Sequence, residues 1–270
     1  MTESSFFTEL SAWLETPAGR YMLAWEQQQL DEVVADLFGF HAVQLGLPPL
    51  DALRNNRMPH RWLATDAAEG VGAEGAALPD APRCVALHCH FDALPFPNQS
   101  VDLVVLPHGL ELAHDPHQTL REVERVLVPE GRVVILGFNP ASLWGLKQRM
   151  GRMRQRLGGR GPLFLPRTGE FIGYWRLRDW LRLLSFDVER GRFGCYRPGV
   201  RTDKWMERFS WMEPVGERWW PVLGAVYFLV AVKRVRGMRL VGLKRKEARG
   251  AKAAPAVVAN RHRRATKQQQ

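Results

Sequence analysis

Three side chains that could take part in acid–base chemistry follow one another in the middle of the chain. His108, Glu111 and His114 are spaced at intervals of three residues, and histidine and glutamate are common proton acceptors and donors in enzymes. Zinc-binding histidines on one helix face are spaced four residues apart, as in H-E-x-x-H, so the spacing does not favour a metal. It indicates a binding contact instead, with His108 or Glu111 as a candidate general base.

A second group of side chains resembles a metal site in composition only. Cys84, His88, Cys89 and His90 are close in sequence, but residues 83–88 have the pattern of a strand that runs into them. Successive side chains of a strand point to opposite faces, so His88 and His90 would point away from Cys89. We therefore expect no metal. The chain has three cysteines, an odd number without a disulfide spacing, which is typical of a reducing compartment.

The elements that must position these side chains alternate between strands and helices. Apolar periodicity predicts helices over 20–38 and 177–184. A further helix is expected to begin at Pro116, with Asp115 as its N-cap, and to end near Pro129 and Gly131. The short apolar runs that predict strands are 40–45, 61–65, 83–88, 101–106, 132–137, 185–192 and 222–232.

Strands that are joined through helices must run parallel, with right-handed crossovers. The sequence therefore predicts an α/β fold with a doubly wound, mostly parallel sheet. Ligands of such sheets bind outside the carboxyl ends of the strands, which is where His108 stands. Asp102 lies inside the strand 101–106 and is expected to be structural, and Asn139-Pro140 is expected to form a turn.

The net charge of +10 lies mostly outside the predicted fold. Residues 233–270 hold 13 Lys and Arg and one acid, whereas residues 1–232 have a net charge of −2. Within this body, residues 140–169 hold seven Lys and Arg and no acid. This basic insert could be a solvated flap, a lid or a surface for anionic partners. The organisation expected is a domain of residues 1–236 followed by a basic disordered tail, 237–270, which could also contact RNA or an anionic surface.

Neither a leader nor a membrane span is expected. The N-terminal residues lack a basic region followed by a long apolar core. The longest apolar run, 221–232, has twelve residues, which is too short to cross a bilayer. We therefore expect a cytoplasmic protein.

One stretch of the chain carries a family motif. Residues 90–137 contain, in order, Leu94-Pro95-Phe96, Val101-Asp102, Leu110-Glu111, Asp115-Pro116, Leu120-Arg121-Glu122, Arg125-Val126-Leu127 and Pro129-Glu130-Gly131. In these motifs and their spacing the chain resembles class I S-adenosylmethionine-dependent methyltransferases, in particular those of ubiquinone and menaquinone biosynthesis. The resemblance implies a Rossmann-like sheet that ends in an antiparallel strand pair, with S-adenosylmethionine as the cofactor.

The resemblance also implies cofactor contacts, which follow the ends of the strands. Gln44 and Gly46 would face the methionine end, Asp66 the ribose, and Asp92, Ala93 and Leu94 the adenine. Leu106 and His108, at the end of the fourth strand, complete the implied set. The family has an acidic residue and G-x-G-x-G after its first strand. Here Gln44 stands for the acid, and Pro48 and Leu50 stand for the second and third glycines.

Three functions remain open on the sequence alone. The first is an active methyltransferase with a small-molecule acceptor, such as a quinone precursor. The second is an RNA-binding or RNA-modifying factor that uses the basic tail. The third is a catalytically degenerate methyltransferase fold that acts as a binding protein, because the glycine motif is incomplete. The catalytic residues are unknown at this stage, as is the oligomeric state.

Overall fold

The computed structural model describes residue 10 and residues 12–66, 86–158, 163–165, 171–200 and 202–234. The predicted basic tail, its boundary at residue 236 and parts of the basic insert lie outside the described residues. Among the helices that are described, none is long and apolar enough to cross a membrane.

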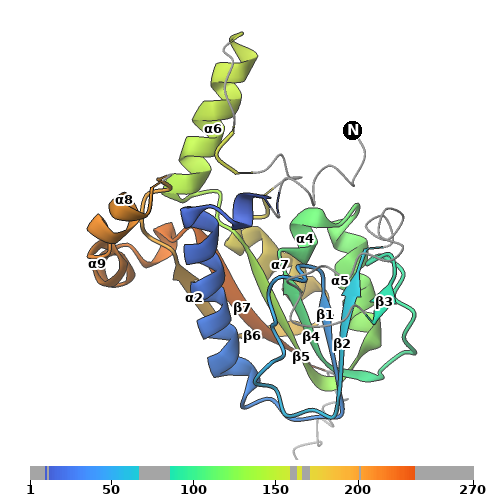
Figure 1. Cartoon of the computed structure of the whole chain (residues 1–270). Helices are drawn as coiled ribbons and strands as arrows, with labels where there is room; N and C mark the ends of the chain where they lie inside the picture. Colours follow the sequence, from blue (N-terminus) through green and yellow to red (C-terminus); the bar gives the residue numbers. More distant parts are fainter. Residues whose placement is uncertain are drawn as a thin grey trace, which may run out of the picture. The chain divides into compact units, whose positions relative to one another are not determined.

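One sheet of seven strands organises the described residues, in the order β3-β2-β1-β4-β5-β7-β6 (Figure 1). The first five strands in this order pair in parallel, and β7 pairs antiparallel with both β5 and β6. The predicted doubly wound sheet with a C-terminal antiparallel pair is therefore confirmed. The strands are β1 (His41–Leu45), β2 (His60–Thr65), β3 (Leu87–His88), β4 (Val101–Pro107), β5 (Leu127–Phe138), β6 (Phe186–Gly194) and β7 (Val226–Lys233).

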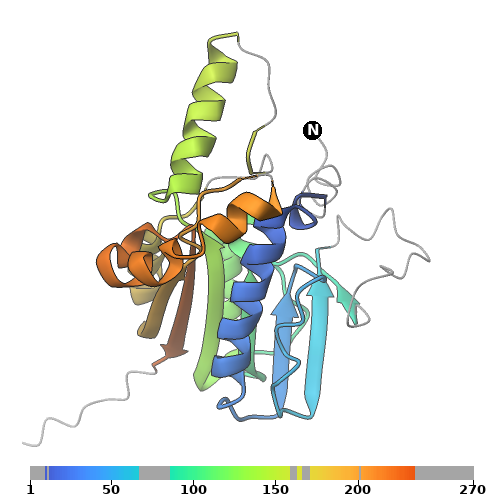
Figure 2. The ribbon, with the colours of Figure 1, turned by 60° about the vertical axis from the view of Figure 1, so that its left-hand side comes forward.

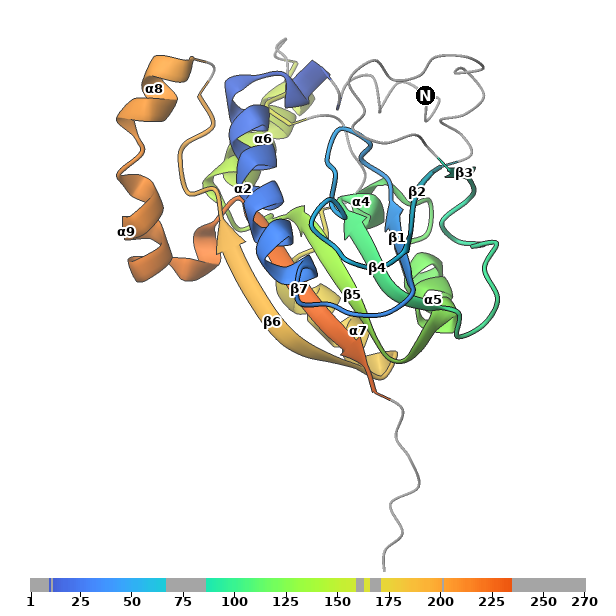
Figure 3. The same ribbon diagram turned by 60° about the horizontal axis from the view of Figure 1, so that its bottom comes forward.

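Helices cover both faces of the sheet (Figure 3). The helix α2 packs on one face, and α5 and α7 pack on the other. The helical elements are α2 (Pro17–Val34), α4 (Gly109–Leu112), α5 (Pro116–Val126), α6 (Leu143–Arg156), α7 (Tyr174–Leu183), α8 (Asp203–Arg208), α9 (Met212–Trp219) and the 3-10 turn η1 (Pro221–Leu223).

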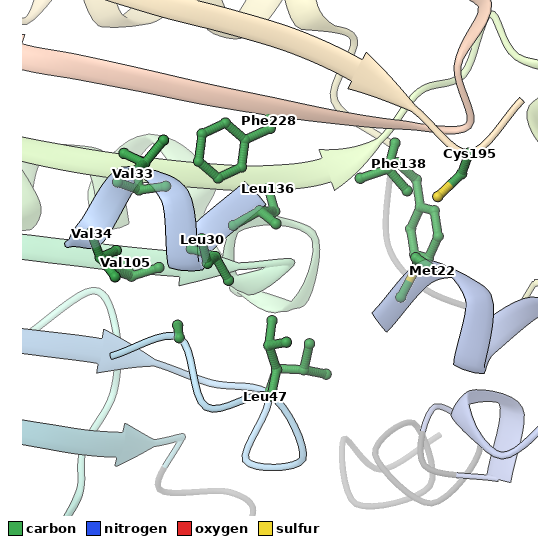
Figure 4. Packing of buried hydrophobic residues seen from close by; sticks show 14 of the residues in the cluster. Met22, Leu30, Val33, Val34, Leu47, Val105, Leu136, Phe138, Cys195 and Phe228 are labelled. Carbon is green, nitrogen blue, oxygen red and sulfur yellow. The ribbon is translucent and has the colours of Figure 1, made fainter. Parts of the chain in front are cut away.

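The core under α2 follows the alternation of the strands. Leu30, Val33 and Val34 of α2 meet Val105 and Leu136, which point to the same face of β4 and β5 (Figure 4). The intervening residues, such as Val104 and Ile135, point to the other face and pack with α5 and α7. Because both faces are covered there, residues 103–107 of β4 and 133–138 of β5 are all buried and include no polar side chain, as expected for buried parallel strands.

Several boundaries differ from those predicted, for local reasons. The helix α2 begins at Pro17, three residues before the predicted start, because the Thr16 hydroxyl caps it by accepting from Gly19 N–H at 3.2 Å. The prediction extended β7 back to residue 222, but residues 221–223 form the turn η1 and the strand begins at Val226. The helices α8 and α9 were not predicted.

Two residues have the structural roles expected of them. The Asp102 carboxylate accepts hydrogen bonds from the backbone N–H groups of Phe40 and His41, both at 2.9 Å, and so fixes the start of β1. Asn139 donates from Nδ2 to Val222 O and Gly224 O at 2.7 and 2.9 Å, which holds the turn after β5.

Candidate functional site

A pocket of about 340 Å³ lies at the edge of the sheet where β2 and β3 end. Its lining comes from the segments that follow β2 and β3, from the connection between α4 and α5, and from α5 itself. The lining residues are Asp66, His90, Phe91, Asp92, Ala113, His114 and Thr119. This is the edge at which doubly wound sheets bind ligands.

Asp66 is the carboxylate that β2 delivers to this pocket. Its side chain is 20% exposed, and Oδ1 lies 3.6 Å from His90 Nδ1. The short strand β3 is held beside β2 by a hydrogen bond of 2.7 Å between Thr65 Oγ1 and His88 Nδ1. Burial on one side and solvent on the other leave a carboxylate that can accept hydrogen bonds from a ligand's hydroxyl groups.

An aromatic side chain closes the pocket towards β1. Phe91 is only 2% exposed, and its ring lies 3.6 Å from the position that a Cβ atom would take on Gly46. Gly46 has a φ of +84°, a conformation that favours glycine. The glycine retained from the family motif therefore lets the chain turn after β1, next to Phe91.

The segment that carries Asp92 is anchored by α5. Arg125 donates to Leu94 O at 2.8 Å and to Phe96 O at 2.9 Å, and Glu122 accepts from Leu94 N–H at 3.1 Å. The two side chains also pair with each other at 2.8 Å, and the hydrogen bonds from Arg125 lower the pKa of Glu122. The Glu and Arg of the family motif thus hold the Leu-Pro-Phe segment at the edge of the pocket.

Gln44 braces the loop that follows β1. Its side chain is 1% exposed. Nε2 donates to the carbonyl oxygens of Gly46, Leu47 and Leu50 at 2.7–3.2 Å, and Oε1 accepts from Ala52 N–H at 3.0 Å. A carboxylate at this position would face three carbonyl oxygens without a proton to offer. The glutamine therefore supplies both the donor and the acceptor that the backbone of this loop requires.

The same loop offers few backbone donors to a ligand. Gly46 N–H bonds to Ala64 O at 2.8 Å, Leu50 N–H bonds to Leu47 O at 3.1 Å, and Pro48 and Pro49 have no N–H. The side chains of Leu47 and Leu50 are 2% exposed and belong to the core under α2. A loop of this kind is stabilised by its own core contacts and hydrogen bonds.

We expect that replacing Gln44 with alanine lowers the free energy of unfolding by about 3 kcal/mol, because buried backbone groups lose their partners. Denaturant unfolding of the full chain measures this. Gln28→Ala is the matched control, since Gln28 is exposed on α2 and should change stability by less than about 0.5 kcal/mol. Equal stability of the two variants would contradict the bracing role.

A buried cluster of ionisable groups lies beside the pocket, where β4 and β5 end. His108 Nε2 is 2.7 Å from Glu26 Oε1 of α2, and His108 Nδ1 is 3.0 Å from Glu111 Oε2 of α4. Glu111 Oε1 also accepts from Phe138 N–H at 2.6 Å. Glu26 Oε2 has no hydrogen-bond partner among the described residues. The cluster ties α2, α4 and the end of β5 together.

The charges of this cluster follow from its contacts. Burial favours the neutral imidazole, but the carboxylates of Glu26 and Glu111 outweigh it and raise the pKa of His108 to about 10. Burial also raises the pKa of Glu111, against the hydrogen bonds from His108 and Phe138. These contacts favour the imidazolium form of His108. Both of its ring nitrogens are hydrogen-bonded to carboxylates, so neither is free to take a proton from a substrate.

The structure therefore separates the predicted site residues into groups. Asp66 and Asp92 line the pocket. Ala93 is exposed beside it, while Leu94 and Leu106 are buried and Gln44 and Gly46 form the loop after β1. His108 and Glu111 form the buried cluster, and His114 alone of the three lines the pocket. Contacts of these residues with a cofactor stay predictions.

Sequence reasoning missed several residues of this region. His90, Phe91, Ala113 and Thr119 line the pocket because β3 is so short that the chain turns at once into the site. Glu26 was also missed, although it carried a signal, since it is a charged residue on the apolar face of α2 between Met22 and Leu30. No cluster of three or more His, Cys, Asp or Glu side chains suited to a metal ion is found among the described residues.

The strand order, with an antiparallel strand inserted between β5 and β6, defines the class I methyltransferase fold. Comparison with known proteins agrees with this class. The family model described as "Methyltransferase domain" matches residues 50–135. A Thermotoga maritima structure described as a SAM-dependent methyltransferase, possible histamine N-methyltransferase, superimposes with a TM-score of 0.58 at 16% identity, covering 86% of this chain and 97% of that one.

Two curated proteins illustrate the relatives at the sequence level. The uncharacterized protein YafS of Escherichia coli strain K12 is 28% identical over 233 residues, which is 86% of this chain and 84% of that protein. The ubiquinone/menaquinone biosynthesis C-methyltransferase UbiE of Hahella chejuensis is 48% identical, but over only 48 residues, or 18% of this chain and 19% of that protein. S-adenosylmethionine is the cofactor that these comparisons imply.

Proposed function

We propose that this chain transfers a methyl group from S-adenosylmethionine to a small-molecule acceptor. The observation that carries the proposal is the pocket at the ends of β2 and β3, with Asp66 and Phe91 in its wall. Its place at the carboxyl edge of a class I methyltransferase fold supports a cofactor site. The finer assignment to quinone biosynthesis stays a prediction, because the matches to such enzymes are short.

The residues present fit the nucleoside half of the cofactor. Asp66 could accept hydrogen bonds from both ribose hydroxyls, Phe91 offers an apolar wall for the adenine, and Asp92 could accept from the adenine's amino group. A volume of about 340 Å³ falls at the lower end of the range for small-molecule pockets. His90 and His114 supply further polar groups at the rim.

The fit to the methionine half is weaker. The loop after β1 uses much of its polar backbone internally, and two prolines stand where the family has flexible, donor-rich residues. We therefore infer that binding free energy comes mainly from the nucleoside half. The bound sulfonium supplies an already activated methyl group, so that the protein's part is to position the acceptor in line with it.

Titration calorimetry of the full chain tests this function. We expect S-adenosylmethionine and S-adenosylhomocysteine to bind with micromolar affinity. Methylthioadenosine, which lacks the amino-acid half, should bind within about 10-fold of S-adenosylhomocysteine. No heat of binding at about 1 mM cofactor would overturn the proposal. Much weaker binding of methylthioadenosine would show that the loop after β1 does contribute donors.

The acceptor class requires a second measurement. Transfer of a labelled methyl group into the small-molecule fraction of a cell extract is expected, and label in RNA or protein alone would contradict it. Cofactor binding without transfer to any fraction would instead support the degenerate fold, an alternative that the comparisons do not favour. A contact of RNA with the basic tail stays a prediction, because the tail lies outside the described residues.

A further inference from the structure

The helix α6 has a buried face that attaches it to the rest of the domain. Trp144 is 1% exposed and donates from Nε1 to Arg197 O at 2.8 Å. Gln148, also 1% exposed, exchanges hydrogen bonds of 2.9 and 3.1 Å with the backbone of Leu165. These contacts fix the rotation of the helix about its axis. They therefore determine which of its side chains face solvent.

The opposite face of α6 is apolar and exposed. At about 100° per residue, its large apolar side chains fall within about 80° of the helix circumference, opposite Trp144 and Gln148. They are spaced three and four residues apart, which places them in one stripe. The stripe consists of Leu143, Leu146, Met150, Met153 and Leu157, which are 48%, 51%, 57%, 64% and 78% exposed.

Basic side chains flank this apolar stripe on both sides. By the same helical spacing, Lys147 and Arg154 lie along one border, and Arg149 and Arg156 lie along the other; all four are exposed. The sequence of α6 contains no acidic residue. An exposed apolar stripe between two cationic borders is typical of helices that lie in the interface of an anionic bilayer.

Exposed tryptophans occur on α8 and around α9, which follow in sequence the segment that α6 contacts. Trp205 of α8 and Trp211, Trp219 and Trp220 around α9 are 50–70% exposed. The helix α6 reaches this part of the chain through Trp144, and Lys147 also donates to Gly199 O. Tryptophan is enriched where proteins contact the bilayer interface, because its ring is apolar and its N–H is polar.

We propose that α6 binds the surface of an anionic lipid bilayer, with its apolar stripe among the acyl chains and its Arg side chains among the headgroups. The helix has 14 residues, about 21 Å, which suits lying in the interface and not crossing it. It extends away from the sheet in two views of the molecule (Figure 1, Figure 2), so that the body of the domain leaves its outer face open.

Other occupants fit this face less well. A second copy of α6 would bring two sets of basic borders together, and like charges along a helix pair repel. Nucleic acid would be attracted by the arginines, but single strands stack on aromatic rings and duplexes contact polar side chains, so neither makes use of a Leu and Met stripe. An anionic bilayer matches both the charge and the apolar surface.

Vesicle co-sedimentation of the full chain tests the proposal. Vesicles of phosphatidylcholine with about one third phosphatidylglycerol are compared with vesicles of phosphatidylcholine alone. We expect binding to the anionic vesicles only. The variant Leu146→Gln/Met150→Gln/Met153→Gln should lower the partition coefficient by more than about 100-fold, since each apolar side chain loses its burial. The variant Arg149→Gln/Arg154→Gln/Arg156→Gln should lower it by about 100-fold, roughly fivefold for each charge.

The controls separate α6 from the basic tail, which all variants retain. Leu183→Gln, a substitution of an 84% exposed residue on α7, should bind vesicles like the wild type. Circular dichroism should show that each variant remains folded. Wild-type affinity of the apolar-stripe variant would overturn the proposal, as would sedimentation that depends on charge alone. A different result is a wild type that fails to sediment with vesicles but binds RNA, together with an apolar-stripe variant that binds RNA equally well. That combined result would assign the arginines to nucleic acid.

Discussion

Replacing His108 with leucine is expected to lower the free energy of unfolding by about 3–5 kcal/mol at neutral pH, because it leaves buried carboxylates without their counter-ion. Glu26 and Glu111 are 0% and 5% exposed, and both contact the His108 ring. Leucine fills much of the volume of the histidine side chain. The decrease in the free energy of unfolding therefore reports the lost charge and hydrogen bonds of His108. Denaturant unfolding followed by circular dichroism measures it.

The pH dependence has a definite sign. The pKa of His108 is about 10 in the folded chain and near 6.5 in an unfolded one. The folded state therefore binds more protons between these values, and its stabilisation by His108 is complete below about pH 6.5 and is lost as the pH rises towards 10. The difference in the free energy of unfolding between the wild type and His108→Leu should become smaller towards pH 10.

Two further variants make this result specific. Glu32→Gln removes a carboxylate that is half exposed and 2.7 Å from Arg192, and should cost less than about 1 kcal/mol. The triple variant Glu26→Gln/His108→Leu/Glu111→Gln should regain part of the lost stability, because no charge is then buried without a partner. If His108→Leu were as stable as the wild type at pH 7, the cluster would not be ionised.

Replacing Asp66 with alanine is expected to weaken the binding of S-adenosylhomocysteine by roughly 5- to 150-fold, or about 1–3 kcal/mol, since the ribose hydroxyls lose their acceptor. Asp66→Asn keeps one acceptor oxygen and should retain an intermediate affinity. Calorimetry of the full chain gives both dissociation constants. Methylthioadenosine should be affected to the same extent, because it carries the same ribose.

A matched control for Asp66 lies at the far edge of the sheet. Asp187 is an exposed aspartate of β6, the last strand in the sheet order, whereas β2 lies next to the opposite end. Asp187→Ala should bind S-adenosylhomocysteine like the wild type. Thermal unfolding should show that both variants are folded. A dissociation constant for Asp66→Ala within twofold of the wild type would remove Asp66 from the cofactor site.

The sequence by itself determined the fold class, because this information is local. The strands β1, β4 and β5 are buried on both faces, so each reads as a short apolar run, and the run alone identifies it. Asp115 and Pro116 predict the start of α5, because the N-cap hydrogen bonds involve only neighbouring residues. The motif around Leu94 and Arg125 could also be recognised in the sequence, but its role in anchoring the loop could not be predicted from it.

Only the tertiary structure decided how the polar residues divide between the core and the pocket. His108, Glu111 and His114 are evenly spaced in sequence, yet the first two turn inward to meet Glu26 and the third lines the pocket. The pairing with Glu26 joins residues 82 positions apart, and the bonds of Gln44 depend on the path of a folded loop. Spacing along the chain cannot report such contacts, because they arise only when separate elements pack together.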